Sequence, residues 1–296
     1  MSYETVLLQL AILLMLLSST QSAFCPSKSA QPILSRPFIR TACLALPPSA
    51  VADLKHQGYC VIPNFIPNDL QASLRADVAS LRGNSNFKVA KIGQDSTNTL
   101  NQEIRVAETC FLGTSKTNLP YCDARNDLYQ LLAEIRMDLA KEFGTNLDAN
   151  LDELLYAYYP KGGFYRRHRD AIPGSASVLR SYSLLLYLNE GVWEERQGGQ
   201  LRLHLDAGRD VLPQGETPNF VDILPQGGTL VLLKSDSIPH EVLDTNSERI
   251  ALVGWYNRAV SAGDISNLAG EGEKSQLLLL AVAAALVTVG LVNILG

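Results

Sequence analysis

The hydrophobic pattern of the chain changes at Leu151, and this change constrains the fold more than any other feature. Ahead of it, two segments at residues 68–83 and 126–144 repeat apolar residues at helical spacing. After it come five closely spaced β-rich runs bounded by Gly, Pro, Asn and Asp, at residues 151–160, 178–190, 198–205, 219–236 and 248–258. Helices followed by such strands predict an α+β fold: a double-stranded β-helix, or jelly-roll barrel, braced by the N-terminal helices.

The two helical segments have recognisable ends as well as apolar stripes. Either Asn68 or Asp69 is expected to cap the first helix, and the second is expected to end at Gly144. The stripes comprise Leu70, Leu74, Val78 and Leu81 in the first segment and Leu128, Leu131, Leu132, Ile135 and Leu139 in the second. Residues 83–104 are polar and predict a loop, whereas residues 50–67 predict a helix followed by a strand.

The body of the chain, residues 52–258, has an ordinary size for one β-rich domain. We divide it into N-terminal helices with a supporting strand (52–150) and the β-helix core (151–258). A net charge of −5 indicates no nucleic-acid partner. The five cysteines have no CxxC spacing, which argues against a thiolate zinc site; a Cys110–Cys122 disulfide is left open. Nothing in the sequence indicates an oligomeric state.

The N-terminus predicts targeting segments. Residues 1–23 have a short apolar stretch followed by small residues, which is typical of a signal peptide. Residues 24–51 are rich in Ser and Pro, with basic and no acidic side chains, and read equally well as a plastid transit-like segment or as a linker. The chain is therefore expected to enter the secretory pathway and to reside in the ER lumen or in a secondary plastid.

The C-terminus predicts a membrane anchor. Residues 277–296 carry no charge, and twenty helical residues cover about 30 Å, the thickness of a bilayer core. We expect a linker at residues 259–275 and a transmembrane helix at residues 276–296. A GPI signal is the alternative, because Ser266-Asn267 supplies small residues ahead of a polar spacer.

Two of the chain's four histidines, together with one aspartate, predict a metal site. His168 and Asp170 are two positions apart, so on a strand both side chains would point to one face. His240 follows an apolar strand and could complete a site of two imidazoles and one carboxylate, the ligand set of non-haem Fe(II) oxygenases. His56 and His204 are expected to be structural, with His204 on a sheet surface opposite leucines.

Arg249, nine residues after His240, predicts an anion site near this metal. Strand alternation places Arg249 on the same face as Ala251, Val253 and Trp255. A guanidinium that faces into a barrel is costly unless it meets an anion, and its planar fork suits a carboxylate. A dicarboxylate co-substrate could therefore bind the metal at one end and Arg249 at the other. Tyr187 and Tyr159 could add hydrogen bonds or could simply pack in the core.

Taken together, residues 57–258 resemble the 2-oxoglutarate- and Fe(II)-dependent dioxygenases of the prolyl 4-hydroxylase class. The resemblance rests on "YYPKGGFYRRHRD", "YLNE", "GGQLRL", "PHEV" and "ERIALVGWYN", which occur in the family's order. The interval of nine residues from His240 to Arg249, with Arg rather than Lys, is similar to the hypoxia-factor prolyl hydroxylase branch.

The resemblance implies a role for each matching residue. It makes His168, Asp170 and His240 the Fe(II) ligands. It implies that the residues that bind 2-oxoglutarate are Arg249, Tyr187 and Tyr159. It places Tyr165 and Trp255 close to the substrate. Alternation additionally places Arg166 on the ligand face, where it would steer an acidic substrate or remain a solvated charge.

The activity implied by the resemblance is hydroxylation of a peptidyl residue, with proline as the expected target. O2 would be the second co-substrate, 2-oxoglutarate would be decarboxylated to succinate and CO2, and ascorbate is expected as a reductant. Val253 replaces a polar residue of the hypoxia branch, and that branch's C-terminal helical tail is missing, which puts the substrate in doubt. A lysyl, small-molecule or lipid substrate, or a non-catalytic membrane-anchored binding module, are the alternatives.

Overall fold

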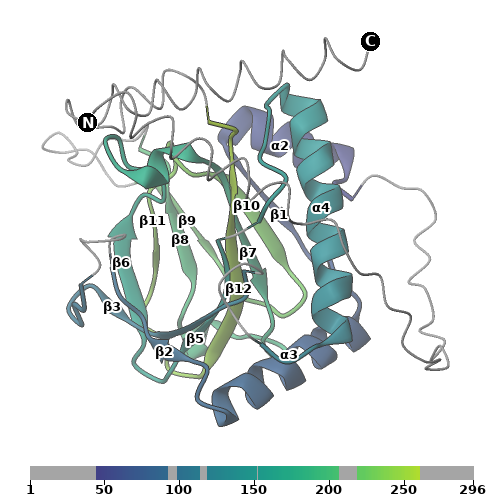
Figure 1. Cartoon of the computed structure of the whole chain (residues 1–296). Coiled ribbons are helices and arrows are strands. Elements are labelled where there is room, and N and C mark those ends of the chain that lie inside the picture. The colour runs from purple at the N-terminus through teal and green to yellow at the C-terminus, as the bar shows by residue number, and fades with distance from the viewer. Residues whose placement is uncertain (1–44, 93–98, 114–118, 152, 207–218, 261–296) are drawn as a thin grey trace, which may run out of the picture. The chain divides into compact units, whose positions relative to one another are not determined.

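The computed structural model describes residues 45–92, 99–113, 119–151, 153–206 and 219–260 (Figure 1). Its helices are α2 (Pro48–Gln57), α3 (Asn68–Gly83) and α4 (Asp123–Phe143), with the 3-10 turns η2 (Ala176–Leu179) and η3 (Glu195–Gln197). Its strands are β1 (Tyr59–Ile62), β2 (Lys88–Val89), β3 (Arg105–Val106), β4 (Glu108–Phe111), β5 (Leu154–Tyr159), β6 (Phe164–His168), β7 (Arg180–Tyr187), β8 (Leu201–His204), β9 (Phe220–Ile223), β10 (Leu230–Lys234), β11 (His240–Val242) and β12 (Arg249–Asn257).

The strands form two antiparallel sheets that pack face to face. The larger sheet has the order β1-β10-β7-β12-β5-β4-β2, and the smaller has the order β3-β6-β11-β8-β9. Side chains from both sheets meet in one buried cluster, to which β7 contributes Leu185 and Tyr187 and β8 contributes Leu201 and Leu203. This arrangement confirms the predicted jelly-roll fold.

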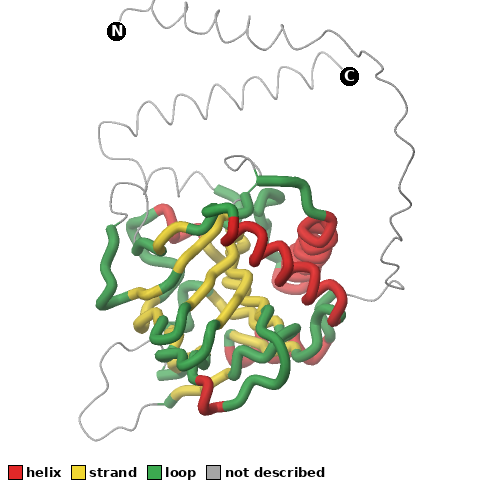
Figure 2. The backbone as a smooth tube through the Cα atoms, turned by 90° about the horizontal axis from the view of Figure 1, so that it is seen from below, coloured by secondary structure: helices red, strands yellow, loops and turns green. Residues whose placement is uncertain are grey.

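The helices α3 and α4 cover the outer face of the larger sheet. Their apolar stripes share a buried cluster with Leu184 and Leu186 of β7 and with Leu252 of β12. In Figure 2 the long helices, in red, lie on the right of the strands, and shorter red segments lie elsewhere around them. Because β7 is covered on both faces, its run of apolar residues does not alternate with polar ones as it would at a solvated sheet.

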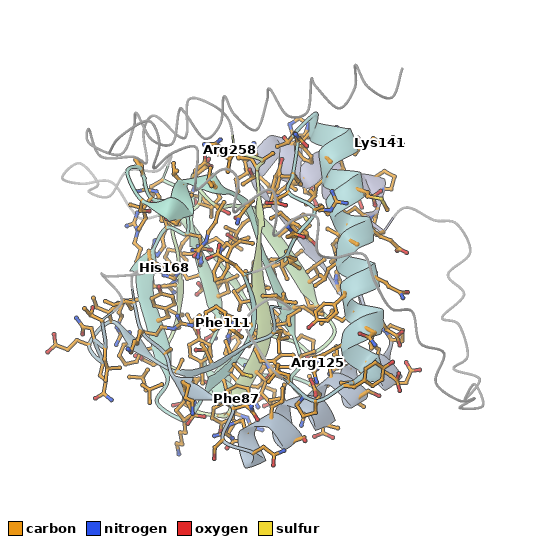
Figure 3. All side chains as sticks on the ribbon, viewed as in Figure 1. Phe87, Phe111, Arg125, Lys141, His168 and Arg258 are labelled. Atoms are coloured by element: carbon orange, nitrogen blue, oxygen red, sulfur yellow. The ribbon has the colours of Figure 1, made fainter. Side chains whose placement is uncertain are left out.

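A buried ion pair ties the two helices to this sheet. Arg125 of α4 lies 2.9 Å from Asp77 of α3, and both side chains are only 8% exposed. The Tyr156 hydroxyl on β5 donates to the same carboxylate at 3.0 Å. Figure 3 shows Arg125 at the end of α4 that approaches α3. Three elements distant in sequence are thus linked by one polar contact inside the core.

Some predicted boundaries are confirmed and others are wrong. Gly144 ends α4 in the left-handed conformation, with a φ of 62°, as its sequence position indicates. The predicted capping of α3 is wrong, because Pro67 occupies the cap position, and the Asp69 carboxylate accepts only from the adjacent Leu70 amide. The first described helix, α2, begins at Pro48 within the segment predicted to be a linker. The predicted 83–104 loop contains the short strand β2.

The predicted signal peptide at residues 1–23 and the predicted transmembrane helix at residues 276–296 lie outside the described residues. So do residues 24–44 of the predicted transit-like segment or linker and residues 261–275 of the linker predicted at residues 259–275. Within the part of the chain that the structure describes, no helix has the length and apolar character needed to cross a membrane. Cys110 and Cys122 are both free thiols, so the disulfide left open above does not form in this structure.

Candidate metal centre

His168, Asp170 and His240 converge between the sheets. His168 is the last residue of β6, Asp170 lies two residues beyond it, and His240 is the first residue of β11, directly opposite His168 in the ladder. The Nε2 atoms of His168 and His240 each lie 3.5 Å from an Asp170 oxygen. The three potential ligand atoms all lie within 4.8 Å of one another. Figure 3 shows His168 on the side of the molecule away from α4.

Backbone carbonyls orient both imidazole rings. The Nδ1 atom of His168 lies 2.8 Å from the Arg166 carbonyl, and that of His240 lies 3.1 Å from the Ile238 carbonyl. A carbonyl can only accept, so each Nδ1 carries the proton and each Nε2 presents a lone pair. This tautomer is the one that a metal bound through Nε2 requires.

The buried environment sets the charges of these ligands. Burial alone would raise the pKa of the Asp170 carboxyl, but the neighbouring His240 and His168 rings and the Ser183 hydroxyl hold it well below its usual range. Burial lowers the pKa of His240 to about 4, although the Asp170 carboxylate opposes this shift. The Asp170 carboxylate and the neutral His240 imidazole therefore face the same point as the His168 ring at neutral pH, and two imidazoles with one carboxylate are a donor set that fits Fe(II).

Arg249 provides a buried cation with unused donors in the same interior. Its side chain is 0% exposed, and its Nε atom donates to the Gly199 carbonyl at 2.9 Å. Both terminal nitrogens are buried without a hydrogen-bond partner among the described residues, as is the Tyr187 hydroxyl. The guanidinium carbon lies 4.9 Å from the Tyr159 ring centre and 5.1 Å from that of Tyr187.

These orphaned donors fit an anionic ligand. A buried guanidinium without a counter-charge is strongly unfavourable, and a carboxylate could accept from both terminal nitrogens at once. Burial also raises the pKa of Tyr187 to about 12, so its hydroxyl keeps its proton and remains a donor. The Arg249 and Tyr187 donors can therefore bind one carboxylate end of a dicarboxylate such as 2-oxoglutarate.

The three residues predicted to lie near the substrate occupy different positions. Tyr165 stacks on His168 with ring centres 3.7 Å apart. Trp255 has a buried indole nitrogen without a partner among the described residues, and the Arg180 guanidinium lies over its ring at 3.9 Å. Arg166 is half exposed and pairs with Asp244 at 3.2 Å. Contact of these three with a substrate stays a prediction.

A register shift interrupts the strand alternation from which Arg166 was predicted to share the ligand face, so that placement stays a prediction. His240 pairs with His168, but Val242 pairs with Tyr165, so β6 has one extra residue in this interval. The shift breaks strict alternation, and the Tyr165 ring, three residues before His168, stacks on the imidazole. His204 lies on the sheet surface opposite buried leucines, as predicted, and contacts Glu241 at 3.1 Å, whereas His56, predicted to be structural, is exposed on α2.

Sequence reasoning missed several residues that support the site. Ser183 donates to Asp170 at 2.7 Å, and Arg180 donates to the Asp170 carbonyl at 3.1 Å. Gly199 supplies the carbonyl that holds Arg249. One signal was available for Ser183: in "SYSLLLYL" it occupies the same face as Leu185 and Tyr187, where a polar residue needs a partner.

Comparisons with known proteins agree with this geometry. Residues 154–257, which contain the triad and Arg249, match the sequence model of the 2OG-Fe(II) oxygenase superfamily. A prolyl 4-hydroxylase from Pseudomonas putida is similar at 28% identity with a TM-score of 0.58, over 72% of this chain and 98% of that chain. A prolyl hydroxylase from Trichoplax adhaerens, solved with a peptide fragment of the hypoxia-inducible factor oxygen degradation domain, is 25% identical with the same TM-score. That similarity covers 74% of this chain and 89% of that chain.

The same fold occurs in a more distant structure. The α-ketoglutarate-dependent epimerase SnoN of nogalamycin biosynthesis is 15% identical with a TM-score of 0.50, over 70% of this chain and 80% of that chain. The two prolyl hydroxylases share both higher identity and closer structure, and the triad fits the metal that the superfamily uses. Residues 154–257 therefore form a 2OG-Fe(II) oxygenase domain, and the chain is similar in sequence and fold to prolyl 4-hydroxylases.

Proposed function

We propose that this dioxygenase hydroxylates a peptidyl residue, with proline as its target, in a reaction coupled to decarboxylation of 2-oxoglutarate to succinate and CO2. The observation that carries the coupling is the Arg249 guanidinium, fully buried with both terminal nitrogens free of partners among the described residues. Support for a peptide substrate comes from the similarity to two prolyl hydroxylases, one of them solved with a peptide.

The side chains of the barrel would prepare the co-substrate for reaction. Arg249 would donate to the distal carboxylate of 2-oxoglutarate, with Tyr187 donating from the neighbouring strand and the Tyr159 ring lying beside the guanidinium. His168, Asp170 and His240 would hold Fe(II), which, when bound with O2, supplies the oxidising power. The apolar side chains around this interior would exclude water; they are Leu185, Leu201, Val231 and Leu233.

Substrate approach would be from the side of Tyr165 and Trp255. Tyr165 keeps His168 packed from one side, since its ring stacks on the imidazole. The indole N–H of Trp255 has no partner among the described residues. It could donate a hydrogen bond to a carbonyl of the substrate. Arg166 lies further out, where it is available to attract an acidic segment of a substrate.

A coupled assay tests this proposal. The enzyme is incubated with Fe(II), 2-oxoglutarate, ascorbate and a library of proline-containing peptides, and succinate release is measured together with the peptide masses. Succinate that rises with a peptide gaining one oxygen on proline is the expected result. Oxygen gained on lysine, or succinate release stimulated only by a lipid or small molecule, would replace the proline assignment. No succinate under any condition would indicate a binding module.

We further propose that residues 276–296 anchor the enzyme in a membrane after residues 1–23 direct it into the secretory pathway. The support is the uncharged run at residues 277–296, long enough to span a bilayer core. Full-length protein should stay in the membrane fraction after alkaline carbonate washing, and removal of residues 276–296 should release it. Release by a phosphatidylinositol-specific phospholipase would identify a GPI anchor instead. Imaging of residues 1–51 fused to a fluorescent protein distinguishes the ER lumen from a secondary plastid.

A further inference from the structure

Two serine hydroxyls lie behind the Asp170 carboxylate in a fully buried position. Ser183 belongs to β7, and Ser235 follows directly after β10, the neighbouring strand. Both residues are 0% exposed. Two positions further into the sheet on the same faces lie the buried apolar residues Leu185 and Leu233, so a pair of hydroxyls at this depth needs hydrogen-bond partners of its own.

The hydrogen-bond distances define a direction for the pair. The Ser183 hydroxyl donates to the Asp170 Oδ2 atom at 2.7 Å. Its oxygen also lies 2.8 Å from the Ser235 hydroxyl oxygen. A hydroxyl has one proton, and the Ser183 proton points at the carboxylate, so Ser235 must be the donor in the second contact. The chain of donors therefore runs from Ser235 to Ser183 to Asp170.

Asp170 needs such support because no strand holds it. The β6 ladder ends at His168, and Asp170 lies two residues beyond that end. Its backbone carbonyl accepts from Arg180, and the next amide, that of Ala171, donates to the Ser235 carbonyl at 3.1 Å. These contacts fix the main chain, whereas the Ser183 hydroxyl donates directly to the carboxylate, whose oxygens also lie 3.5 Å from the two imidazole Nε2 atoms.

We propose that Ser235 and Ser183 form a hydroxyl relay that positions the Asp170 carboxylate for metal binding. This inference rests on the metal site assigned above. The Ser235 donor polarises the Ser183 hydroxyl, which strengthens the bond to the carboxylate in a low-dielectric interior. The carboxylate is then held toward the two Nε2 atoms before a metal arrives. The serines are positioning residues, since they act through Asp170.

Metal affinity of the metal-free protein tests the relay without using enzyme turnover. Mn(II), which resists oxidation, is titrated into wild-type protein and variants by calorimetry. Ser183→Ala should weaken Mn(II) binding by about 10- to 100-fold, the usual effect of losing a hydrogen bond to a metal ligand. Ser235→Ala should weaken it by less, about 2- to 12-fold, because it removes only a neutral hydrogen bond one step away.

The double variant distinguishes a relay from two independent structural serines. If Ser235 acts through Ser183, Ser183→Ala/Ser235→Ala should bind Mn(II) as Ser183→Ala does, within about twofold. If the loss of Mn(II) affinity in the double variant equals the product of the losses in the two single variants, the relay is overturned. Wild-type Mn(II) affinity in a folded Ser183→Ala protein would also overturn it. Should Ser183→Ala fail to fold, Ser235→Ala alone decides the matter, since unchanged Mn(II) affinity in that variant also excludes the relay.

Tyr256→Phe is the matched control. It deletes a buried hydroxyl that donates to the Leu132 carbonyl at 2.8 Å, on the helix side of the larger sheet. This variant should lower the midpoint of thermal unfolding and leave Mn(II) affinity unchanged; a weakened affinity would show that Mn(II) binding reports general stability and would overturn the relay. Failure of the wild-type protein to bind Mn(II) would instead refute the metal site itself.

Discussion

Arg249 carries a permanent positive charge into the barrel without solvent or a carboxylate partner among the described residues. Its Nε atom is anchored at Gly199, so the terminal nitrogens are held toward Tyr187 and Tyr159. An unpaired buried charge is a cost to stability that is retained where a ligand supplies the missing partner. At the scale of single residues, this side chain and the triad carry the chemistry.

Replacing Arg249 should affect 2-oxoglutarate more than metal. Arg249→Ala removes a charged hydrogen bond of about 1.5–3 kcal/mol, so the KM for 2-oxoglutarate should rise by about 10- to 150-fold. Mn(II) affinity should stay near that of the wild type, since Arg249 contacts no metal ligand. Steady-state kinetics and Mn(II) titration give the two values. An unchanged KM would show that the carboxylate binds elsewhere.

Metal-free protein should lose stability as the pH falls from about 6.5 to about 4. His240 titrates at about 4 in the folded state because burial lowers its pKa, whereas an unfolded histidine titrates near 6.5. In this window the unfolded state binds more protons, so acid favours unfolding, by about 3 kcal/mol in full. Urea unfolding of wild type and His240→Asn across this range measures the effect; an equal pH dependence in both proteins would rule out His240 as its source.

At the scale of elements, short turns decide where the functional side chains point. The extra residue in β6 interrupts the alternation of the strand, and Tyr165 stacks on His168 across it. The turn between η3 and β8 contains Gly198 and Gly199, with φ values of 65° and 69°, a conformation that side chains rarely adopt. The Gly199 carbonyl faces Arg249 only because this turn takes that conformation. The regular strands therefore form the barrel, and the irregular positions determine the orientation of the functional side chains.

Gly199→Ala should therefore impair co-substrate binding. A Cβ atom at Gly199 would lie 3.1 Å from Arg249 Cδ and 3.0 Å from Thr245, and the φ of 69° would be strained. Gly191→Ala is the matched control, because Gly191 has a φ of 68° but open space around its Cβ position. The first variant should raise the KM for 2-oxoglutarate, and the second should only lower thermal stability. Equal KM values in the two variants would refute a specific effect on Arg249.

At the scale of the whole molecule, the site depends on two sheets that the helices brace from one side. Both histidines of the triad belong to the smaller sheet, Asp170 follows its strand β6, and Arg249 belongs to the larger sheet, so a dicarboxylate bound at both ends would bridge the two sheets. The Asp77–Arg125 pair and the apolar stripes of α3 and α4 stabilise the larger sheet from outside. Ligands that bind across the sheets should consequently stabilise the entire fold.

Added metal and co-substrate should raise the free energy of unfolding in two steps. Mn(II) at one hundred times its Kd should add about 2.7 kcal/mol, and 2-oxoglutarate should add a further increment. His168→Ala should abolish the first step, whereas Arg249→Ala should lose only the second. Urea unfolding with and without each ligand measures both. Full stabilisation of His168→Ala by Mn(II) would show that the metal binds at another place.

Much of the site follows from local sequence. The two-residue spacing of His168 and Asp170, the isolated His240 and the cation at Arg249 indicate iron and a carboxylate, because side-chain type alone limits which ligands can bind. Likewise, the apolar periods of residues 68–83 and 126–144 determine two helices, since helical spacing is a local property.

The contacts that orient the site residues were decided by tertiary structure alone. The register shift in β6, the Gly199 carbonyl at Arg249, and the Ser235–Ser183–Asp170 contacts all join segments that lie far apart in the chain. Such contacts depend on how strands pair and how sheets pack, and no local spacing encodes them. The sequence by itself thus determined which groups could do the chemistry, and the packing of the two sheets determined which neighbours hold them in place.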